Sequence, residues 1–239
     1  MTTTMLADEQ IERYSRQIIL PQVGGKGQEK LLRASVLLNG AGPLQETALL
    51  YLAAVGIGTI GILTDEEVGL SSVLMPESSD ALTTVPQRLN PECAIVHHHG
   101  TEGHPLTALS QLARNYTLAI SGPDSHLHDA CYIARRPFLC VQSVGTQCWF
   151  LTCRGYDASQ PCAHCVQLPT REEAPSPFVD LAALFLGAQL VTEVVKIILG
   201  LDQSAGATLV RCEFPDLRFD VQKVRKNPDC SYCGHSLSE

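Results

Sequence analysis

The chain has 239 residues, enough for one sizeable hydrophobic core and ordinary for an α/β protein. Its formal net charge of −8 at pH 7 argues against a general nucleic-acid binder, because neutralising phosphates needs clustered lysine and arginine. The N-terminus lacks the basic segment and apolar run of a signal peptide. The apolar stretch from Leu181 to Leu201 is interrupted by polar and charged residues, so we expect a buried or interfacial helix, no membrane span and a cytoplasmic protein.

The predicted elements begin with two helices and a strand–helix–strand unit. Apolar spacing predicts helices at Asp8–Leu20 and Gly27–Arg33, a strand at Ser35–Asn39, a helix at Pro43–Ala54 and a strand at Gly58–Thr64. The turn Gly40-Ala-Gly42 joins the first strand to the helix that follows it. A strand, a glycine turn, a helix and a second strand in this order indicate a βαβ unit with a Rossmann-type crossover.

The rest of the chain alternates short strands and helices before a closing hairpin. Strands are predicted at Ala94–His98, Thr117–Ser121, Phe138–Ser143 and Cys148–Cys153, helices at Leu106–Asn115, His126–Arg135 and Val179–Leu199, and a hairpin at Thr208–Phe214 and Leu217–Val224. We therefore expect an α/β, Rossmann-like fold with a mixed, mainly parallel sheet flanked by helices.

Two cysteine pairs carry the clearest chemical signal, Cys162-Ala-His-Cys165 and Cys230-Ser-Tyr-Cys233. The two-residue spacer lets both sulfurs of a pair face one ion, and four thiolates suit a closed, tetrahedral, structural zinc site. Redox pairs or two disulfides are the alternatives, but Pro161 before the first pair and Gly234 after the second indicate two knuckles in loops. The remaining cysteines have mostly apolar neighbours and favour a reducing compartment.

Histidines raise the possibility of another metal site. His97, His98 and His99 follow one another on a predicted strand, where only the first and third share a face. His126 and His128 stand two residues apart at a predicted helix start and do not share a face. We therefore expect neither group to bind a metal.

Several segments together resemble one known family. Arg13–Leu20, Gly27–Leu32, Gly40–Gly42, Tyr51–Gly58 and the two cysteine pairs resemble, in order and spacing, the ThiF/MoeB/HesA group of ubiquitin-activating-type enzymes. The resemblance implies a single adenylation-type domain over 1–239, with N-terminal helices in 1–34, a nucleotide-binding-like core in 35–160 and a zinc-stapled part in 161–239. It also implies the use of ATP and Mg²⁺ to adenylate the C-terminal glycine of a ubiquitin-like sulfur-carrier protein by a homodimer.

The resemblance assigns a nucleotide site to particular positions. Gly40 and Gly42 correspond to the phosphate loop, and Asp65 and Glu66 lie in the stretch that resembles the acidic, ribose-binding motif. Asp124 matches the magnesium-binding aspartate of the family. Arg16 matches the arginine that reaches the nucleotide of the neighbouring subunit.

Other positions depart from the family pattern. The phosphate loop of the family resembles Gly-x-Gly-Gly-x-Gly, but Pro43 and Gln45 replace two of those glycines here, and a proline offers no N–H to a phosphate. Thr64, Ser72 and Met75 replace the family's ribose aspartate, an asparagine and an arginine.

These losses lead us to expect impaired ATP binding. The first interpretation is a pseudoenzyme that binds a sulfur-carrier protein or forms a heterodimer with an active, paralogous activating enzyme. The alternative is an active adenylyltransferase with a rewired nucleotide site. A nicotinamide oxidoreductase, suggested by Gly40-x-Gly42 alone, is disfavoured because the third glycine of that fingerprint is absent.

Overall fold

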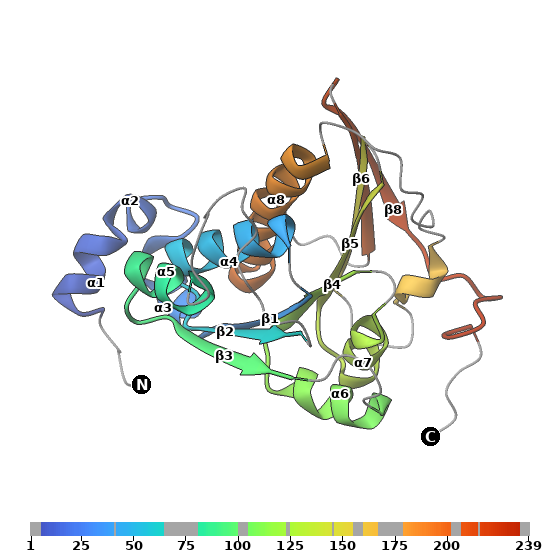
Figure 1. Ribbon diagram of the computed structural model, residues 1–239, viewed down its shortest axis with the longest axis horizontal. Helices are drawn as coiled ribbons and strands as arrows, with labels where there is room; N and C mark the ends of the chain where they lie inside the picture. The colour runs from blue at the N-terminus through green and yellow to red at the C-terminus, as the bar shows by residue number, and fades with distance from the viewer. Residues whose placement is uncertain are drawn as a thin grey trace.

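The fold is built on one long mixed sheet with helices on both faces, seen in the computed structural model in Figure 1. The structure describes residues 6–40, 42–64, 81–99, 105–122, 125–144, 146–154, 160–166, 179–201, 207–214 and 216–234. The helices are α1 Asp8–Arg13, α2 Ser15–Ile18, α3 Gly24–Arg33, α4 Pro43–Val55, α5 Ala81–Leu89, α6 Leu106–Arg114, α7 Leu127–Ala134, the 3₁₀ turn η1 Ala163–Cys165 and α8 Val179–Leu199. The strands are β1 Ser35–Asn39, β2 Thr59–Leu63, β3 Ala94–His98, β4 Leu118–Ser121, β5 Phe138–Val144, β6 Gln147–Cys153, β7 Ala207–Glu213 and β8 Arg218–Val224.

The strand order identifies the edge at which a ligand would bind. The eight strands run β3-β2-β1-β4-β5-β6-β7-β8, parallel from β3 to β5 and antiparallel from there on. This confirms the predicted Rossmann-like, mainly parallel and then mixed sheet. The chain turns to opposite sides of β1 to build β2 and β4, so a topological switch point lies at the carboxyl ends of β1 and β4, where α/β sheets of this kind bind ligands.

Alternating side chains of β1 feed two separate cores. Val36 and Leu38 are buried on the face covered by α4 and α8, whereas Leu37 is buried on the face covered by α6 and α7. Successive residues of a strand point to opposite faces, and a parallel strand covered on both faces reads as the continuous apolar run seen in the sequence. Figure 1 shows the two helix layers on either side of the sheet.

Helix α8 lies unusually close to the first turns of α4. A Cβ placed on Gly187 would lie 2.6 Å from the carbonyl oxygen of Leu44 and 2.6 Å from Cβ of Thr47. Only glycine allows this backbone approach, so α8 fixes the position of the helix that begins at the switch point.

The apolar stretch that ends near Leu201 forms part of this core helix, as predicted. Among the described residues, α8 is the one helix whose length and composition would allow it to cross a membrane, a test that core helices also pass. Leu186, Leu190 and Val194 on α8 are fully buried in the core. The buried Glu193 contacts Arg154 Nη2 and Lys196 Nζ, each at 2.7 Å.

Two elements differ from the sequence prediction. The expected first helix is interrupted at Tyr14, whose buried ring packs against Gly56 at the far end of α4. Helix α5 was not predicted, and its Pro86 explains why, because a proline in a helix interior removes a backbone hydrogen bond and argues against a helix.

Candidate functional site

The turn between β1 and α4 places two glycines in conformations that other residues rarely adopt. Gly40 and Gly42 adopt φ values of +91° and +133°, which glycine reaches far more readily than other residues. The loop ends at Pro43, the first residue of α4, and the Gly42 carbonyl accepts the first helical hydrogen bond from Glu46 N at 2.9 Å. The helix N-terminus, with its partial positive charge, therefore stands at the switch point of the sheet.

The side chain of Gln45 folds back over this loop. Its Nε2 donates to the carbonyl oxygen of Asn39 at 3.3 Å. A Cβ on Gly40 would lie 3.2 Å from Gln45 Nε2, and a Cβ on Gly42 would lie 3.6 Å from Gln45 Oε1. The predicted extra side chain is thus in contact with both glycines, and the chain's own amide covers the turn.

A polar contact joins the two sides of the switch point. Asn39 Nδ2 at the end of β1 donates to Ser125 Oγ at 2.6 Å, and the same Oγ accepts from Leu127 N at 3.1 Å, near the start of α7. The sequence prediction missed Asn39 and Ser125, although a polar residue such as Asn39 at the end of a buried strand is a usable signal. Asp124, Asp65 and Glu66, together with Ser72 and Met75, lie outside the described residues.

Arg16 lies far from this loop within the chain. It is exposed on α2, two residues after Tyr14, whose ring contacts Gly56 at the C-terminal end of α4. Gly42 is at the other end of that 13-residue helix, which spans about 20 Å. The structure therefore does not bring Arg16 together with Gly40 and Gly42 in one chain, so a shared site would require a neighbouring subunit.

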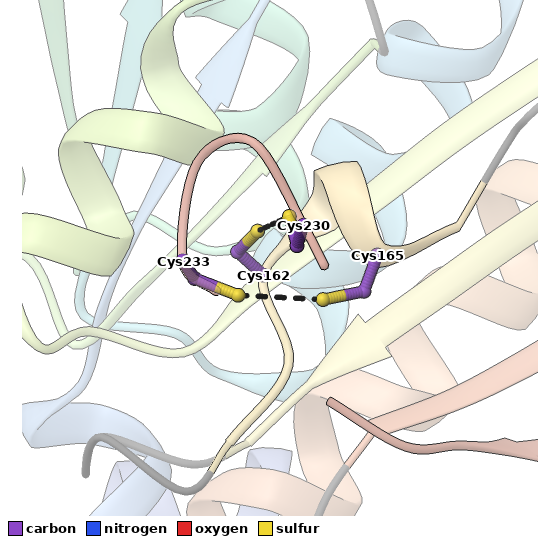
Figure 2. Close-up of side chains that lie close together, drawn as sticks. All are labelled: Cys162, Cys165, Cys230 and Cys233. Atoms are coloured by element: carbon purple, nitrogen blue, oxygen red, sulfur yellow. Dashed lines mark hydrogen bonds between the residues drawn. The ribbon is translucent and has the colours of Figure 1, made fainter. Parts of the chain in front are cut away.

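The four cysteines of the two pairs converge on one point, as Figure 2 shows. Cys162 Sγ lies 3.7 Å from Cys230 Sγ, and Cys165 Sγ lies 3.4 Å from Cys233 Sγ. A disulfide would need about 2.05 Å, whereas a tetrahedron with 2.3 Å zinc–sulfur bonds separates its sulfurs by about 3.8 Å. All ten cysteines are free, so these four fit a zinc ion and the disulfide alternative is excluded.

The local backbone holds the four sulfurs in place. Cys165 N donates to Cys162 O at 3.1 Å in η1, and Gly234 N donates to Cys230 O at 2.8 Å in the second knuckle. The first pair therefore lies on the short 3₁₀ turn η1, which forms the first of the two predicted knuckles. Burial alone would raise the pKa of Cys230, but hydrogen bonds from the backbone N–H groups of Cys233 and Tyr232 and from the Cys162 and Cys233 side chains lower that pKa to about 7. Burial raises the pKa of Cys162 and of Cys165, so Cys230 gives up its proton more readily than these two ligands.

The other cysteines behave as small apolar residues. All six are buried, as predicted. Burial raises the pKa of Cys93 and of Cys148 to about 11, so these thiols stay protonated and unreactive at neutral pH.

Comparison with known proteins identifies a family for this chain. The family model described as "ThiF family" matches residues 14–74. The "Adenylyltransferase and sulfurtransferase MOCS3" of Culex quinquefasciatus is 34% identical over 259 residues, covering 98% of this chain and 58% of that protein. The "Sulfur carrier protein adenylyltransferase" of Thermus thermophilus is 28% identical over 254 residues, covering 95% of this chain and 92% of that protein. This chain belongs to the ThiF family.

Two further comparisons bear on the architecture of this ThiF-family chain. Escherichia coli MccB solved with MccA-N7isoASN matches with a TM-score of 0.74 and 17% identity, covering 93% of this chain and 75% of that one. PaaA matches with a TM-score of 0.71 and 19% identity, covering 95% of this chain and 77% of the PaaA chain. At such identity they support the shared fold alone. The chain spans a little over half of the MOCS3 protein that it matches.

The ThiF-family chain also carries a histidine group that the sequence prediction missed. His128 and Asp129 on α7 lie beside His164 on η1, and their ligand atoms all fall within 4.8 Å of one another. His128 and His164 are 36 residues apart in the sequence, and the group pairs His128 with His164 and Asp129, not with His126. In the strand triplet, His98 Nε2 lies 2.7 Å from Tyr116 Oη, and none of its members belongs to a metal-ligand group among the described residues.

Proposed function

We propose that this chain is an ATP-dependent adenylyltransferase that acts on the C-terminal glycine of a ubiquitin-like sulfur-carrier protein. The observation that carries the proposal is the similarity to the sulfur carrier protein adenylyltransferase of Thermus thermophilus, which extends over 92% of that protein. In this function residues 1–239 act as one adenylation-type domain, and the four cysteines hold a structural zinc ion. Two subunits associate so that Arg16 of one can approach the nucleotide of the other.

The phosphate loop supports this function because its obstruction is inexpensive to remove. The hydrogen bond from Gln45 Nε2 to Asn39 O is long, at 3.3 Å, and a neutral hydrogen bond of this kind contributes about 1 kcal/mol. Rotation of one glutamine side chain would expose Gly40 and Gly42 to a phosphate. ATP binding in the micromolar range has about 8 kcal/mol available, which exceeds that cost.

Proline at the first helical position removes no hydrogen bond from the helix, whereas a proline in the helix interior would remove one. The N–H of this position has no partner within a helix, so Pro43 takes away one donor to the phosphates without weakening α4. The backbone N–H groups of the next two residues and the helix dipole remain to attract the triphosphate. The carrier carboxylate would then attack the α-phosphorus, and pyrophosphate would leave.

A second candidate function is favoured by the same Gln45 contact. If the amide stays over the loop, the chain would bind a sulfur-carrier protein, or an active paralogue, without nucleotide. The replacements at Thr64 and Met75, which remove the family's ribose carboxylate and a cation, point the same way.

Pyrophosphate exchange separates the two functions. Exchange of labelled pyrophosphate into ATP would be measured with the full chain, Mg²⁺ and a sulfur-carrier protein that ends in glycine. We expect exchange that depends on the carrier and falls at least tenfold in Asp124→Asn, while Gly25→Ala in α3, where an added Cβ meets nothing within 4 Å, leaves it unchanged.

If exchange is absent, two further measurements decide whether the second function holds. Absent exchange, absent ATP binding by calorimetry and a stable carrier complex would establish carrier binding without activation. Absence of both exchange and carrier binding would overturn both functions.

A further inference from the structure

We propose that His128, Asp129 and His164 form a second metal site, for a divalent transition ion such as Zn²⁺, beside the four-cysteine cluster. His128 and Asp129 lie in the first turn of α7. His164 lies on η1, between Cys162 and Cys165 of the first knuckle. Imidazole nitrogens and a carboxylate oxygen are ordinary zinc ligands, and the two elements that carry them come together only in the folded chain.

The distances between the donor atoms fit one ion. His128 Nε2 lies 3.4 Å from His164 Nε2 and 3.3 Å from Asp129 Oδ1, and His164 Nε2 lies 2.8 Å from the same oxygen. An ideal tetrahedral zinc with bonds near 2.0 to 2.1 Å separates its ligand atoms by about 3.3 to 3.4 Å. Two of the three separations already have that value. The third opens by about half an ångström if His164 moves slightly outward.

Burial and charge also suit a cation with one open position. The side chains of His128 and Asp129 are 6% and 9% exposed, whereas that of His164 is 41% exposed. The ion would therefore be held from the protein side and reached from solvent past His164. Three protein ligands with an open fourth position are the arrangement of a reactive zinc site, in contrast to the closed set of four cysteines.

The second knuckle supports the ligands of this site. The ring of Tyr232 lies 4.9 Å from the ring of His164, centroid to centroid, and Tyr232 Oη donates to the carbonyl oxygen of Asp129 at 3.5 Å. Tyr232 sits between Cys230 and Cys233, and His164 between Cys162 and Cys165. Zinc in the cysteine cluster would thus fix both knuckles and hold His164 in place.

Among the described residues, one other histidine lies close to these ligands. His126 Nδ1 lies 3.9 Å from Asp129 Oδ2, with its side chain 79% exposed. It contacts the oxygen that does not face the two other imidazoles, so it is not part of the ligand set.

Metal stoichiometry tests the site on the full chain. Protein equilibrated with excess Zn²⁺ and freed of unbound metal should hold two zinc ions, counted by mass spectrometry of the elements, and His164→Ala should hold one. His97→Ala, which removes an exposed histidine from β3, should still hold two. His164 is the variant of choice because its partly exposed side chain is not needed for the core.

Cobalt substitution shows which site is lost. Co²⁺ in the cysteine cluster gives sulfur-to-metal charge-transfer absorption, whereas the second ion, bound by nitrogen and oxygen, adds only ligand-field bands. In His164→Ala and Asp129→Asn the charge-transfer absorption should remain and the added bands should disappear. One zinc per chain in the natural protein, or two that persist in His164→Ala, would overturn the proposal.

Discussion

The cysteine cluster and the turn at Gly40 differ in how their polar atoms are satisfied. In the cluster, four sulfur atoms approach one another at distances that suit a shared ion, with no bond between them. In the turn, Gln45 donates to Asn39 O and covers the glycines, so the chain satisfies part of its own loop. We therefore expect the first region to depend on a bound ion for its stability, and the second to keep its form without a ligand. Zinc occupancy should therefore control folding, whereas nucleotide occupancy should control only activity.

The largest effect is expected from Cys230→Ala. Loss of one thiolate opens the tetrahedral set, and structural zinc contributes much of the folding free energy in sites of this kind. We expect loss of zinc from the cluster, a loss of about 4–5 kcal/mol in unfolding free energy and a fall in Tm of about 10 °C or more.

Cys93→Ala is the matched control for that substitution. It removes a buried thiol outside the cluster and should cost about 1 kcal/mol while leaving the zinc content unchanged. Equal falls in Tm for the two variants would show that zinc does not stabilise the fold. Thermal unfolding with and without a chelator provides the comparison.

Gly234→Ala should affect the same region less strongly. A Cβ at Gly234 would meet the carbonyl oxygens of Pro228 and Cys230, the latter at 2.5 Å, and neither backbone group can move without opening the knuckle. We expect a loss of about 1–3 kcal/mol in unfolding free energy and weaker zinc retention against a chelator. Gly25→Ala, which meets nothing within 4 Å, should be neutral or slightly stabilising.

Substitutions at Gln45 test whether its amide obstructs the loop. Gln45→Ala removes the side chain beyond Cβ, and we expect ATP binding, measured by calorimetry, to tighten about tenfold, or about 1.4 kcal/mol. Gln45→Leu keeps the bulk but removes the hydrogen bond to Asn39 O, so it should tighten ATP binding by less than Gln45→Ala. Equal ATP affinity in all three proteins would mean that Gln45 does not limit access.

The smallest effect concerns the contact across the switch point. Asn39→Ala removes the 2.6 Å hydrogen bond to Ser125 Oγ and should cost about 1 kcal/mol in denaturant unfolding. Ser125→Ala also removes the bond from Leu127 N, so it should cost slightly more. A double-mutant cycle should give a coupling near 1 kcal/mol, and a coupling of zero would show that the two residues act independently.

Local patterns explain why much of the fold was predictable from the sequence. The strand Ser35–Asn39 and the long helix Val179–Leu199 were predicted with their observed bounds, because a continuous apolar run and a helical period are local signals. Helix α5 was missed because Pro86 argues locally against it, and tertiary packing decides the outcome.

The candidate sites also differ in how far the sequence could predict them. The two cysteine pairs were recognisable because each pair carries its own spacing. The grouping of His128, Asp129 and His164 has no such spacing, since α7 and η1 meet only after folding. The sequence also indicated that Gln45 adds a side chain to the loop, but the direction of that side chain depends on the backbone of Gly40 and Gly42, which only the structure provides.

The close approach at Gly187 has a kinetic consequence for nucleotide entry. Because the backbone of α8 contacts Leu44 and Thr47, the first turns of α4 cannot swing outward to admit a ligand. Access to the loop must then come from rotation of the half-buried Gln45 side chain. Side-chain rotations at accessible positions take picoseconds to nanoseconds, whereas collective domain motions take microseconds to milliseconds. Nucleotide association should therefore proceed at a rate set by diffusion and orientation, without a slow opening phase.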